Sequence, residues 1–444
     1  MTTPSYASWR PLLLENVTIE TLRAETYRRF IFDAAIVPGC RLLLARHRRR
    51  PDWPYVDTKF NPNTGAELPP AAYGVVHTWF LGRGSEALDD HLRVLDACQS
   101  LADDERAAIR TVFETWIANM TRTIGDLAVR YGSHMPFRVN RALTAVDPNG
   151  QPLAPAAVKP DSADIFCAKG LMSARDPVLQ ACGLQMLRDG AVRARRDTAE
   201  MSTQTPGVGG VGHGARMLIQ GAAVCFARKA LDRAAREEVL DLAATMLGEV
   251  LDRHYDPATT LFSEYYDPDT RERGRYLDPG HAAELAGLGL GMIEHLEQSS
   301  LAASHAALIA RSRRDLPPLL LRAVALGYNT RHRGMFKGVD NRTGQPINFD
   351  MPWWNLPETM RAAVRAYAVA DSSLLRAQCL DAFRLCHNAY FSRFLNRANG
   401  LFPYQTISGE TGKVVDVVPA VPEGDPLYHA NGAFLDMLGV LARL

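Results

Sequence analysis

The chain has 444 residues, 47% of them hydrophobic, which is enough for two or three ordinary domains or for one large barrel. Its 50 basic and 49 acidic residues give a formal net charge of +1, so no extended field is available to bind nucleic acid or an anionic membrane surface. This balance favours a small neutral or singly charged ligand.

The seven cysteines, from Cys40 to Cys386, include no CxxC pair, which argues against a disulfide framework and against a zinc site. We therefore expect a cytoplasmic protein without a structural metal. The first residues lack a basic start followed by an apolar stretch, and no segment reaches the ~20 apolar residues that a membrane-spanning helix needs. Neither secretion nor membrane insertion is expected.

Apolar residues recur at intervals of three and four from about residue 17 to the C-terminus, which indicates a succession of amphipathic or buried helices. The pattern is plain in residues 107–129, 215–247, 282–296 and 374–394. Short connectors rich in Asp, Pro, Asn and Gly separate the helices and also suit small β-hairpins. No change of composition and no flexible linker divides the chain, so residues 1–444 are predicted to form one domain.

Some dozen such helices, arranged as hairpins, are each too apolar to be stable alone and must stack side by side. About six helical pairs can close into a ring. The expected fold is therefore all-α, an (α/α)6 barrel of helical hairpins with short β-hairpin connectors.

Residues 207–212 read GVGGVG and satisfy the dinucleotide-binding pattern G-x-G-x-x-G. The preceding MSTQTP is polar and contains Pro206, so no hydrophobic strand leads into the motif and its βαβ context is missing. We interpret the segment as a glycine-rich connector, with a mobile rim to a site beside His213 as the alternative.

His281 and Glu284 open an apolar helix directly after a Pro-Gly turn, in the sequence DPGHAAELAGLGL. Residues three apart lie on one helical face, and the rest of this helix gives no packing reason for an imidazole and an acid to face the same way. Tyr428 and His429 occupy the same place at the start of the last apolar helix. An imidazole with a pKa near neutrality suits proton transfer, although a single histidine is more often structural. The repeated placement favours a shared polar pocket.

The segment MPWWNLPETM begins another helix. Its Glu358 can serve simply as a favourable charge at the helix N-terminus. Trp353 and Trp354 are adjacent and cannot both be buried on one helical face, so we expect an exposed indole ring at the start of the helix. Such a ring is a platform for the apolar face of a pyranose.

Four further residues are candidates for substrate binding: His77, Arg83, Arg216 and Glu264. Arginine can hold an oxyanion or a sugar hydroxyl through two parallel hydrogen bonds. Each of the four could equally be a surface or capping residue.

Taken together, GHAAEL, PWWNLPE and YHANGAF, in this order and roughly 75 residues apart, resemble motifs of the N-acylglucosamine 2-epimerase superfamily. Those motifs read approximately G-H-x-x-E-W, W-W-x-x-x-E and H-x-x-R. The superfamily also includes cellobiose 2-epimerases and mannose and sulfoquinovose isomerases. The resemblance implies an (α/α)6 barrel, a small sugar substrate, no metal or redox cofactor, and a monomer or homodimer.

The resemblance also implies that His281 and His429 act as general acid and base, and that Glu284, Trp354 and Glu358 shape and polarise the pocket. The implied enzyme opens an aldose and removes its C2 proton, and an arginine stabilises the cis-enediolate. Return of the proton to the opposite face of C2 gives the 2-epimer, whereas its delivery to C1 gives a ketose.

Three positions depart from the superfamily pattern. Leu285 stands where a Trp is usual, Leu356 replaces a frequent Gln, and Gly432 occupies the arginine place after His429. Either another arginine, Arg83 or Arg216, supplies the charge, or the substrate differs from a plain hexose. The resemblance is therefore that of a divergent member.

Two other functions remain open at this point. An (α/α)6 glycoside hydrolase, or an unsaturated glucuronyl hydrolase, would work through carboxylates such as Glu264, Glu284 and Glu358. A sugar-binding barrel that has lost catalysis would agree with the missing arginine. Histidines at the two most site-like places argue against both.

Overall fold

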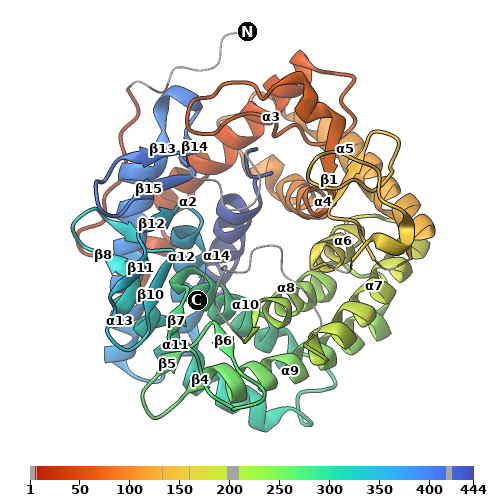
Figure 1. Ribbon diagram of the computed structural model, residues 1–444. Coiled ribbons are helices and arrows are strands. Elements are labelled where there is room, and N and C mark those ends of the chain that lie inside the picture. The colour runs from red at the N-terminus through yellow and green to blue at the C-terminus, as the bar shows by residue number, and fades with distance from the viewer. Residues whose placement is uncertain (1–5, 7, 133, 160, 198–209, 417–422) are drawn as a thin grey trace.

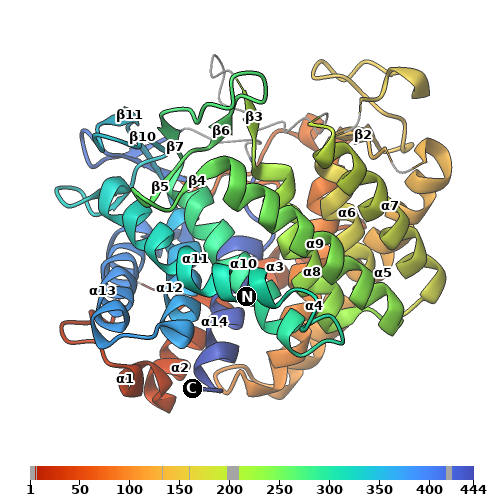
Figure 2. The same ribbon diagram turned by 90° about the horizontal axis from the view of Figure 1, so that it is seen from below.

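The structure, a computed structural model, describes residues 6, 8–132, 134–159, 161–197, 210–416 and 423–444. Within these residues the helices form two concentric rings, seen end-on in Figure 1 and from the side in Figure 2. The inner ring consists of α4 (Thr78–Val94), α6 (Ala163–Leu171), α8 (Gly214–Lys229), α10 (Pro279–Glu297), α12 (Asn355–Val369) and α14 (Ala433–Leu441). The outer ring consists of α3 (Val37–Arg49), α5 (Asp103–Tyr131), α7 (Pro177–Arg195), α9 (Arg233–His254), α11 (Ala306–Gly327) and α13 (Ser373–Ala389).

The inner ring is closed. Neighbouring inner helices contact one another, and the π-helical turn Tyr428–Gly432, which leads into α14, packs against α4. Two short helices, α1 (Ile19–Arg23) and α2 (Glu25–Ile31), come first in the chain, and α2 continues into α3 through a π-helical turn at Phe32–Ile36. The predicted all-α (α/α)6 barrel is confirmed.

Short antiparallel strands fill the connectors, and most of them gather at the end of the barrel drawn at the top of Figure 2. The two-stranded pairs are β1 (Val75–His77) with β2 (Arg138–Asn140), β3 (Val211–Gly212) with β6 (Tyr265–Tyr266), β4 (Tyr255–Asp256) with β5 (Leu261–Phe262), β8 (Tyr328–Asn329) with β9 (Gly334–Met335), and β13 (Leu395–Asn396) with β14 (Phe402–Pro403). The three-stranded sheets are β7 (Tyr276–Leu277), β10 (Gly338–Asp340) and β11 (Pro346–Asn348), and β12 (Asp350–Pro352), β15 (Thr406–Ser408) and β16 (Val414–Val415).

The predicted single helix over residues 215–247 is wrong, because the chain turns between α8 and α9. Ala230 takes an extended conformation, and the side chain of Asp232 accepts a hydrogen bond from the backbone N–H of Ala234, which starts α9. Residues 215–247 therefore form the inner helix α8 and the greater part of its outer neighbour α9. None of the helices that the structure describes is long and apolar enough to cross a membrane.

The glycine-rich segment lies only partly within the described residues. Residues 207–209 lie outside them, whereas Val211 and Gly212 form β3 and pair with β6 directly before α8. The strand therefore leads into an inner helix of the barrel. The βαβ unit that a dinucleotide-binding motif needs is not formed by the described part of this region.

Six helices around one axis must approach closely, and glycine makes this possible where α4 crosses α6. A Cβ placed on Gly82 would lie 2.2 Å from the carbonyl oxygen of Phe166, and one on Gly170 would lie 2.6 Å from the Cα of Gly82. These neighbours are backbone atoms that cannot rotate away. By contrast, a Cβ on Gly432 would meet nothing within 4 Å.

This contrast predicts opposite outcomes for two Gly-to-Ala substitutions. Gly82→Ala should lower the free energy of unfolding by at least about 2 kcal/mol, because α4 and α6 must move apart. Gly432→Ala, in helical conformation with open space around it, should change the free energy by no more than about 1 kcal/mol. Unfolding of both variants in urea, followed by circular dichroism, measures the difference. Equal midpoints would show that the α4–α6 crossing does not depend on Gly82.

Candidate active site

The inner helices all begin at the end of the barrel where the strands gather, which we call the mouth. Each connector delivers its inner helix from that side, so the residues around the first turn of each helix converge on the axis. His213 directly precedes α8, His281 lies in the first turn of α10, and Glu358 lies in the first turn of α12. Residues from different helical pairs therefore form one site.

The first group of polar side chains surrounds Glu264. One oxygen of this carboxylate lies 2.9 Å from Nδ1 of His281, and the other lies 3.2 Å from Nε2 of His213. Asp278 caps α10 by accepting from the backbone N–H groups of Gly280 and His281, and its second oxygen is ion-paired with Lys337. That oxygen also lies 3.4 Å from Nδ1 of His281. Two carboxylates thus face one imidazole.

These carboxylates set the charge of the group. Burial lowers the pKa of His281, but Asp278 and Glu264 more than offset this and raise it above the ordinary histidine value. Burial would also raise the pKa of Glu264, yet His213 and His281 hold it well below its ordinary value. His281 is therefore stabilised as an imidazolium against an ionised Glu264.

The second group surrounds Glu358. One of its oxygens lies 3.1 Å from Nδ1 of His429, and the other is ion-paired with Arg361, one turn further along α12. Burial, together with the charge of Arg83, lowers the pKa of His429 to about 4. Burial also raises the pKa of Glu358, although Arg361 opposes this. His429 is thus neutral at neutral pH, unlike His281.

The backbone around His429 is irregular. Leu427 adopts a left-handed conformation, with φ of 66°, directly before the π-helical turn Tyr428–Gly432. A β-carbon makes this conformation unfavourable, so it persists only where the surrounding structure holds it. π-Helical turns are frequent at functional sites because they change the direction of a side chain without ending the helix. Here the turn delivers His429 to Glu358.

Trp354 lies between the two histidines. Its ring centroid is 5.4 Å from that of His281 and 5.4 Å from that of His429. The expectation of an exposed indole is wrong, because Trp353 and Trp354 are only 3% and 7% exposed. Trp353 packs beside His429, and its indole N–H donates to the side chain of Gln405, whereas Trp354 is covered by His281, His429 and Lys337.

Arg83 enters this region from α4. Its guanidinium stacks on the rings of Trp79, Phe166 and Tyr428, with its carbon 4.7, 4.3 and 5.0 Å from their centroids. Within the described residues it makes no ion pair, and its Nε is buried without a hydrogen-bond partner. The hydroxyl of Tyr428 is hydrogen-bonded to Lys169, which pairs with Glu86 at 3.0 Å. Arg83 is thus a fixed cation with free donors.

Comparisons with known proteins agree with this arrangement. Residues 213–433 match the family described as N-acylglucosamine 2-epimerase (GlcNAc 2-epimerase). The chain belongs to the N-acylglucosamine 2-epimerase superfamily. The matched region includes His281, Trp354, Glu358 and His429, whereas Arg83 lies before it.

Solved structures from this superfamily share the fold along most of the chain. A cellobiose 2-epimerase from Spirochaeta thermophila DSM 6192 is 15% identical with a TM-score of 0.63, covering 96% of this chain and 98% of that one. A crystal structure of D-mannose isomerase is 14% identical with a TM-score of 0.63, covering 97% of this chain and 100% of that one. A search of curated proteins finds no significant match.

Two of the predicted substrate-binding residues, Arg216 and His77, are paired with acidic residues that were not predicted to belong to the site. Arg216 is ion-paired with Glu249 at 2.9 Å and with Asp197 at 2.7 Å, which binds it to the outer ring. His77 lies 2.7 Å from Glu423. Of the two arginines named from sequence, Arg83 is the one with free donors beside His429.

The superfamily arginine place at residue 432 opens onto a small cavity. Gly432 borders a void of about 40 Å³ that is also lined by Lys169, Glu358, Arg361 and Tyr428. Sequence reasoning missed Lys169, Arg361 and Asp278 as members of the site. Arg361 could have been found from sequence, because residues three apart in a helix lie on the same face as Glu358. Lys169 lies far away in sequence and reaches the site because the ring of helices closes.

The two polar groups also hold possible metal ligands. Within the described residues, ligand atoms of His213, Glu264 and His281 lie within 4.8 Å of one another, as do those of Glu284, Glu358 and His429. The sequence did not reveal these clusters because their members come from parts of the chain that are far apart in sequence. In each cluster a carboxylate already accepts a direct hydrogen bond from an imidazole nitrogen.

The arrangement predicts that Glu264 controls the protonation of His281. In Glu264→Gln, one of the two carboxylates that raise the pKa of His281 is lost, so this pKa should fall while that of His429 stays unchanged. Titration of ¹³C-labelled histidines by NMR, with signals assigned from His281→Gln and His429→Gln, measures both.

Glu358→Gln serves as the matched control, since it should leave the titration of His281 in place. An unchanged His281 pKa in Glu264→Gln would contradict the electrostatic account.

Proposed function

We propose that this protein is a sugar isomerase or 2-epimerase that moves a proton through a cis-enediolate between two histidines. The observation that carries the proposal is the pair His281 and His429, held on one aromatic ring, Trp354, with pKa values shifted in opposite directions. Superfamily membership supports an isomerase-type carbohydrate enzyme. A small sugar is the substrate.

The opposite shifts assign the roles. His429, with a pKa of about 4, is neutral at neutral pH, and its Nδ1 faces Glu358, so Nε2 is the atom that removes the C2 proton as a general base. His281, held as a cation by Asp278 and Glu264, is the general acid. Within the described residues Nε2 of neither histidine has a hydrogen-bond partner. Both atoms are available to a substrate.

Arg83 is the group that stabilises the enediolate. It reaches the site on the side of Tyr428, its charge acts on His429, and its donors have no carboxylate partner in the described part of the chain. Removal of the C2 proton places negative charge on the sugar oxygens, where a fixed guanidinium has its greatest effect in a site with little water. Trp354 supports the apolar face of the ring between acid and base.

Arg361 acts through Glu358 and is a positioning residue. Its positive charge opposes the rise that burial causes in the pKa of Glu358, and the Glu358 carboxylate accepts from Nδ1–H of His429, which fixes the tautomer with a free Nε2. Gly432 leaves open the space at the usual arginine place. Arg361 on α12 therefore gives Glu358 a guanidinium partner although residue 432, in the π-helical turn before α14, is a glycine.

No metal takes part in this mechanism. The imidazole and carboxylate groups that could bind one are engaged with each other as hydrogen-bond pairs that suit proton transfer. Activity that survives dialysis against EDTA would support this. We also place the enzyme in the cytoplasm, in keeping with its free thiols, six of which are buried.

Proton NMR in D₂O with a panel of aldoses and ketoses tests the activity. Wild-type protein should replace the C2 proton with deuterium and give a new anomeric pattern, which separates a 2-epimer from a ketose. Cleavage of an oligosaccharide without C2 exchange would instead establish a glycoside hydrolase. Binding without either reaction would establish a non-catalytic barrel.

Replacement of His429 and replacement of His281 should reduce different parts of the reaction. His429→Gln should reduce both C2 exchange and net conversion by about 100- to 10,000-fold, because the base is lost. His281→Gln should reduce net conversion similarly but retain more C2 exchange, since His429 can still remove and return the proton. Circular dichroism controls for folding. Wild-type conversion in both variants would remove the mechanism.

Arg83→Gln should lower kcat by roughly 100-fold with a smaller change in KM, because the guanidinium acts on charge that develops in the transition state. Arg83→Lys keeps the charge without the planar fork and should recover part of the loss. A change confined to KM would make Arg83 a ground-state binding residue.

A further inference from the structure

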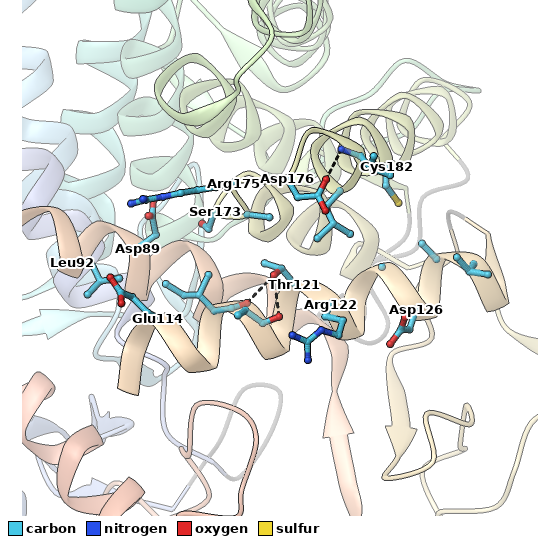
Figure 3. A pocket seen from close by; sticks show the side chains of 18 residues that line it. Asp89, Leu92, Glu114, Thr121, Arg122, Asp126, Ser173, Arg175, Asp176 and Cys182 are labelled. Atoms are coloured by element: carbon cyan, nitrogen blue, oxygen red, sulfur yellow. Dashed lines mark hydrogen bonds between the residues drawn. The ribbon is translucent and has the colours of Figure 1, made fainter. Parts of the chain in front are cut away.

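The C-terminal part of α4 contacts two different regions of the protein. On one side it borders a hollow of about 920 Å³ between α5 and α7, which Asp89 and Leu92 help to line (Figure 3). His91 lies between these two residues in sequence but is only 1% exposed. It is buried against the π-helical turn Tyr428–Gly432, which carries His429.

A buried hydrogen bond joins this turn to α4. The side-chain amide nitrogen of Asn431, a residue that is 3% exposed, lies 2.9 Å from Nε2 of His91. Nδ1 of His91 lies 2.6 Å from the carbonyl oxygen of Ala87, which can only accept, so the hydrogen of this imidazole is on Nδ1. Nε2 is therefore the acceptor, and the amide of Asn431 donates to it. Burial lowers the pKa of His91, which favours this neutral form.

The same amide group of Asn431 also reaches the outer part of the barrel. Its nitrogen lies 3.4 Å from the carbonyl oxygen of Ala35, in the π-helical turn Phe32–Ile36 that joins α2 to α3. The two amide hydrogens thus have acceptors on two different helical elements, which determines how the amide is turned. Gly39 leaves the space for this contact, since a Cβ there would lie 3.0 Å from the amide nitrogen and 2.7 Å from a methyl carbon of Leu427.

The turn Tyr428–Gly432 is therefore held at both of its ends. Asn431 holds the end next to α14, and Asp425 holds the start by accepting from the backbone N–H of Tyr428 at 2.6 Å. A π-helical turn contains one residue more than an α-helical turn. If it relaxed to α-helix, the residues before it would rotate by roughly 100° relative to α14, because successive α-helical residues are that far apart. His429 would then turn away from Glu358.

We propose that His91 and Asn431 are positioning residues for the reaction, which hold the π-helical turn so that His429 stays in contact with Glu358. Arg83 lies two helical turns before His91 on α4, so the same contact fixes the proposed base relative to the cation that stabilises the enediolate. The catalytic consequence rests on the proposed function of His429, whereas the hydrogen bond that holds the turn does not.

Substitutions that remove this hydrogen bond in the full-length protein test the positioning role. His91→Leu and Asn431→Leu should each lower kcat for C2 exchange by about 100-fold with a smaller change in KM, because the base is misplaced. His91→Gln supplies an amide oxygen as acceptor and should recover most of the loss. The double leucine variant should lose no more than either single variant, since both act through one bond. Leu92→Ala, beside the hollow in Figure 3, is the control and should keep the wild-type kcat.

Nitrogen-15 NMR of labelled histidines gives a measurement that does not depend on turnover. In the wild type, His429 should show the Nδ1–H tautomer that its contact with Glu358 imposes, with the signal assigned from His429→Gln. Both leucine variants should lose this signature, whereas His91→Gln and Leu92→Ala should keep it. Asn431→Ala, which adds no bulk, gives the same measurements should a leucine variant fail to fold.

The outcomes separate the positioning role from the proposed function. An unchanged tautomer and an unchanged kcat in the leucine variants, with only the free energy of unfolding lowered, would make the contact merely structural and overturn the positioning role. A His91→Gln variant as impaired as His91→Leu would also overturn it. A wild type that exchanges no sugar proton would instead overturn the proposed function, and the tautomer of His429 would still show whether the two residues hold the turn.

Discussion

The structure depends on how closely six helices can approach one axis while they carry charged side chains toward it. Small residues of the inner ring allow the close approach and also leave space for the charged side chains. Gly82 and Gly170 bring the backbones of α4 and α6 together, and Gly287 on α10 leaves room for Arg361, whose Nε would lie 3.2 Å from a Cβ there. Without these glycines the inner ring would be wider, and residues from α4, α10 and α12 would no longer meet.

The polar interior would be costly if its charges were not paired. Arg365 is held between Glu294 at 2.8 Å and Asp436 at 2.6 Å, and Lys169 faces Glu86 at 3.0 Å. Near the mouth, Arg83 is a partly buried cation that has no ion-pair partner among the described residues. An interior of satisfied ion pairs thus fixes the geometry below the site, and the unpaired cation marks the place where a ligand can supply the missing partner.

The difference between the two histidines has a simple physical origin. Both are buried, which by itself favours the neutral imidazole. His281 faces two carboxylates, so its cationic form is restored, whereas His429 has Arg83 nearby and keeps the neutral form. The two imidazoles are chemically identical, and their pKa values differ because their charged neighbours differ. One desolvated pocket can therefore hold a cationic and a neutral histidine side by side.

Much of this could be read from the sequence. The helical periodicity, the helix count and the family resemblance together predicted the barrel, and the histidines and tryptophans at helix starts pointed to the residues that the structure brings together in the candidate site, because helix termini have local signals. Other features depend on the fold alone. Trp354 is buried against His281 and His429 from two other elements, and the contact of Lys169 with Tyr428 joins the second inner helix to the turn before the last one. Neither has a local pattern. Arg216 was misleading because a charge in an inner helix can face the outer ring as well as the axis.

Gly432 shows why a missing motif residue does not by itself mean a lost function. What Glu358 requires is a guanidinium at bonding distance, not an arginine at a particular place in the sequence. Arg361 meets this requirement from α12, Gly287 leaves room for it on α10, and the absence of a side chain at residue 432 leaves the cavity between them open. Arg361 and Gly287 lie on two inner helices and Gly432 in the π-helical turn before α14, and all three line this cavity. Although the H-x-x-R pattern ends in a glycine, Glu358 thus keeps a guanidinium partner within the structure.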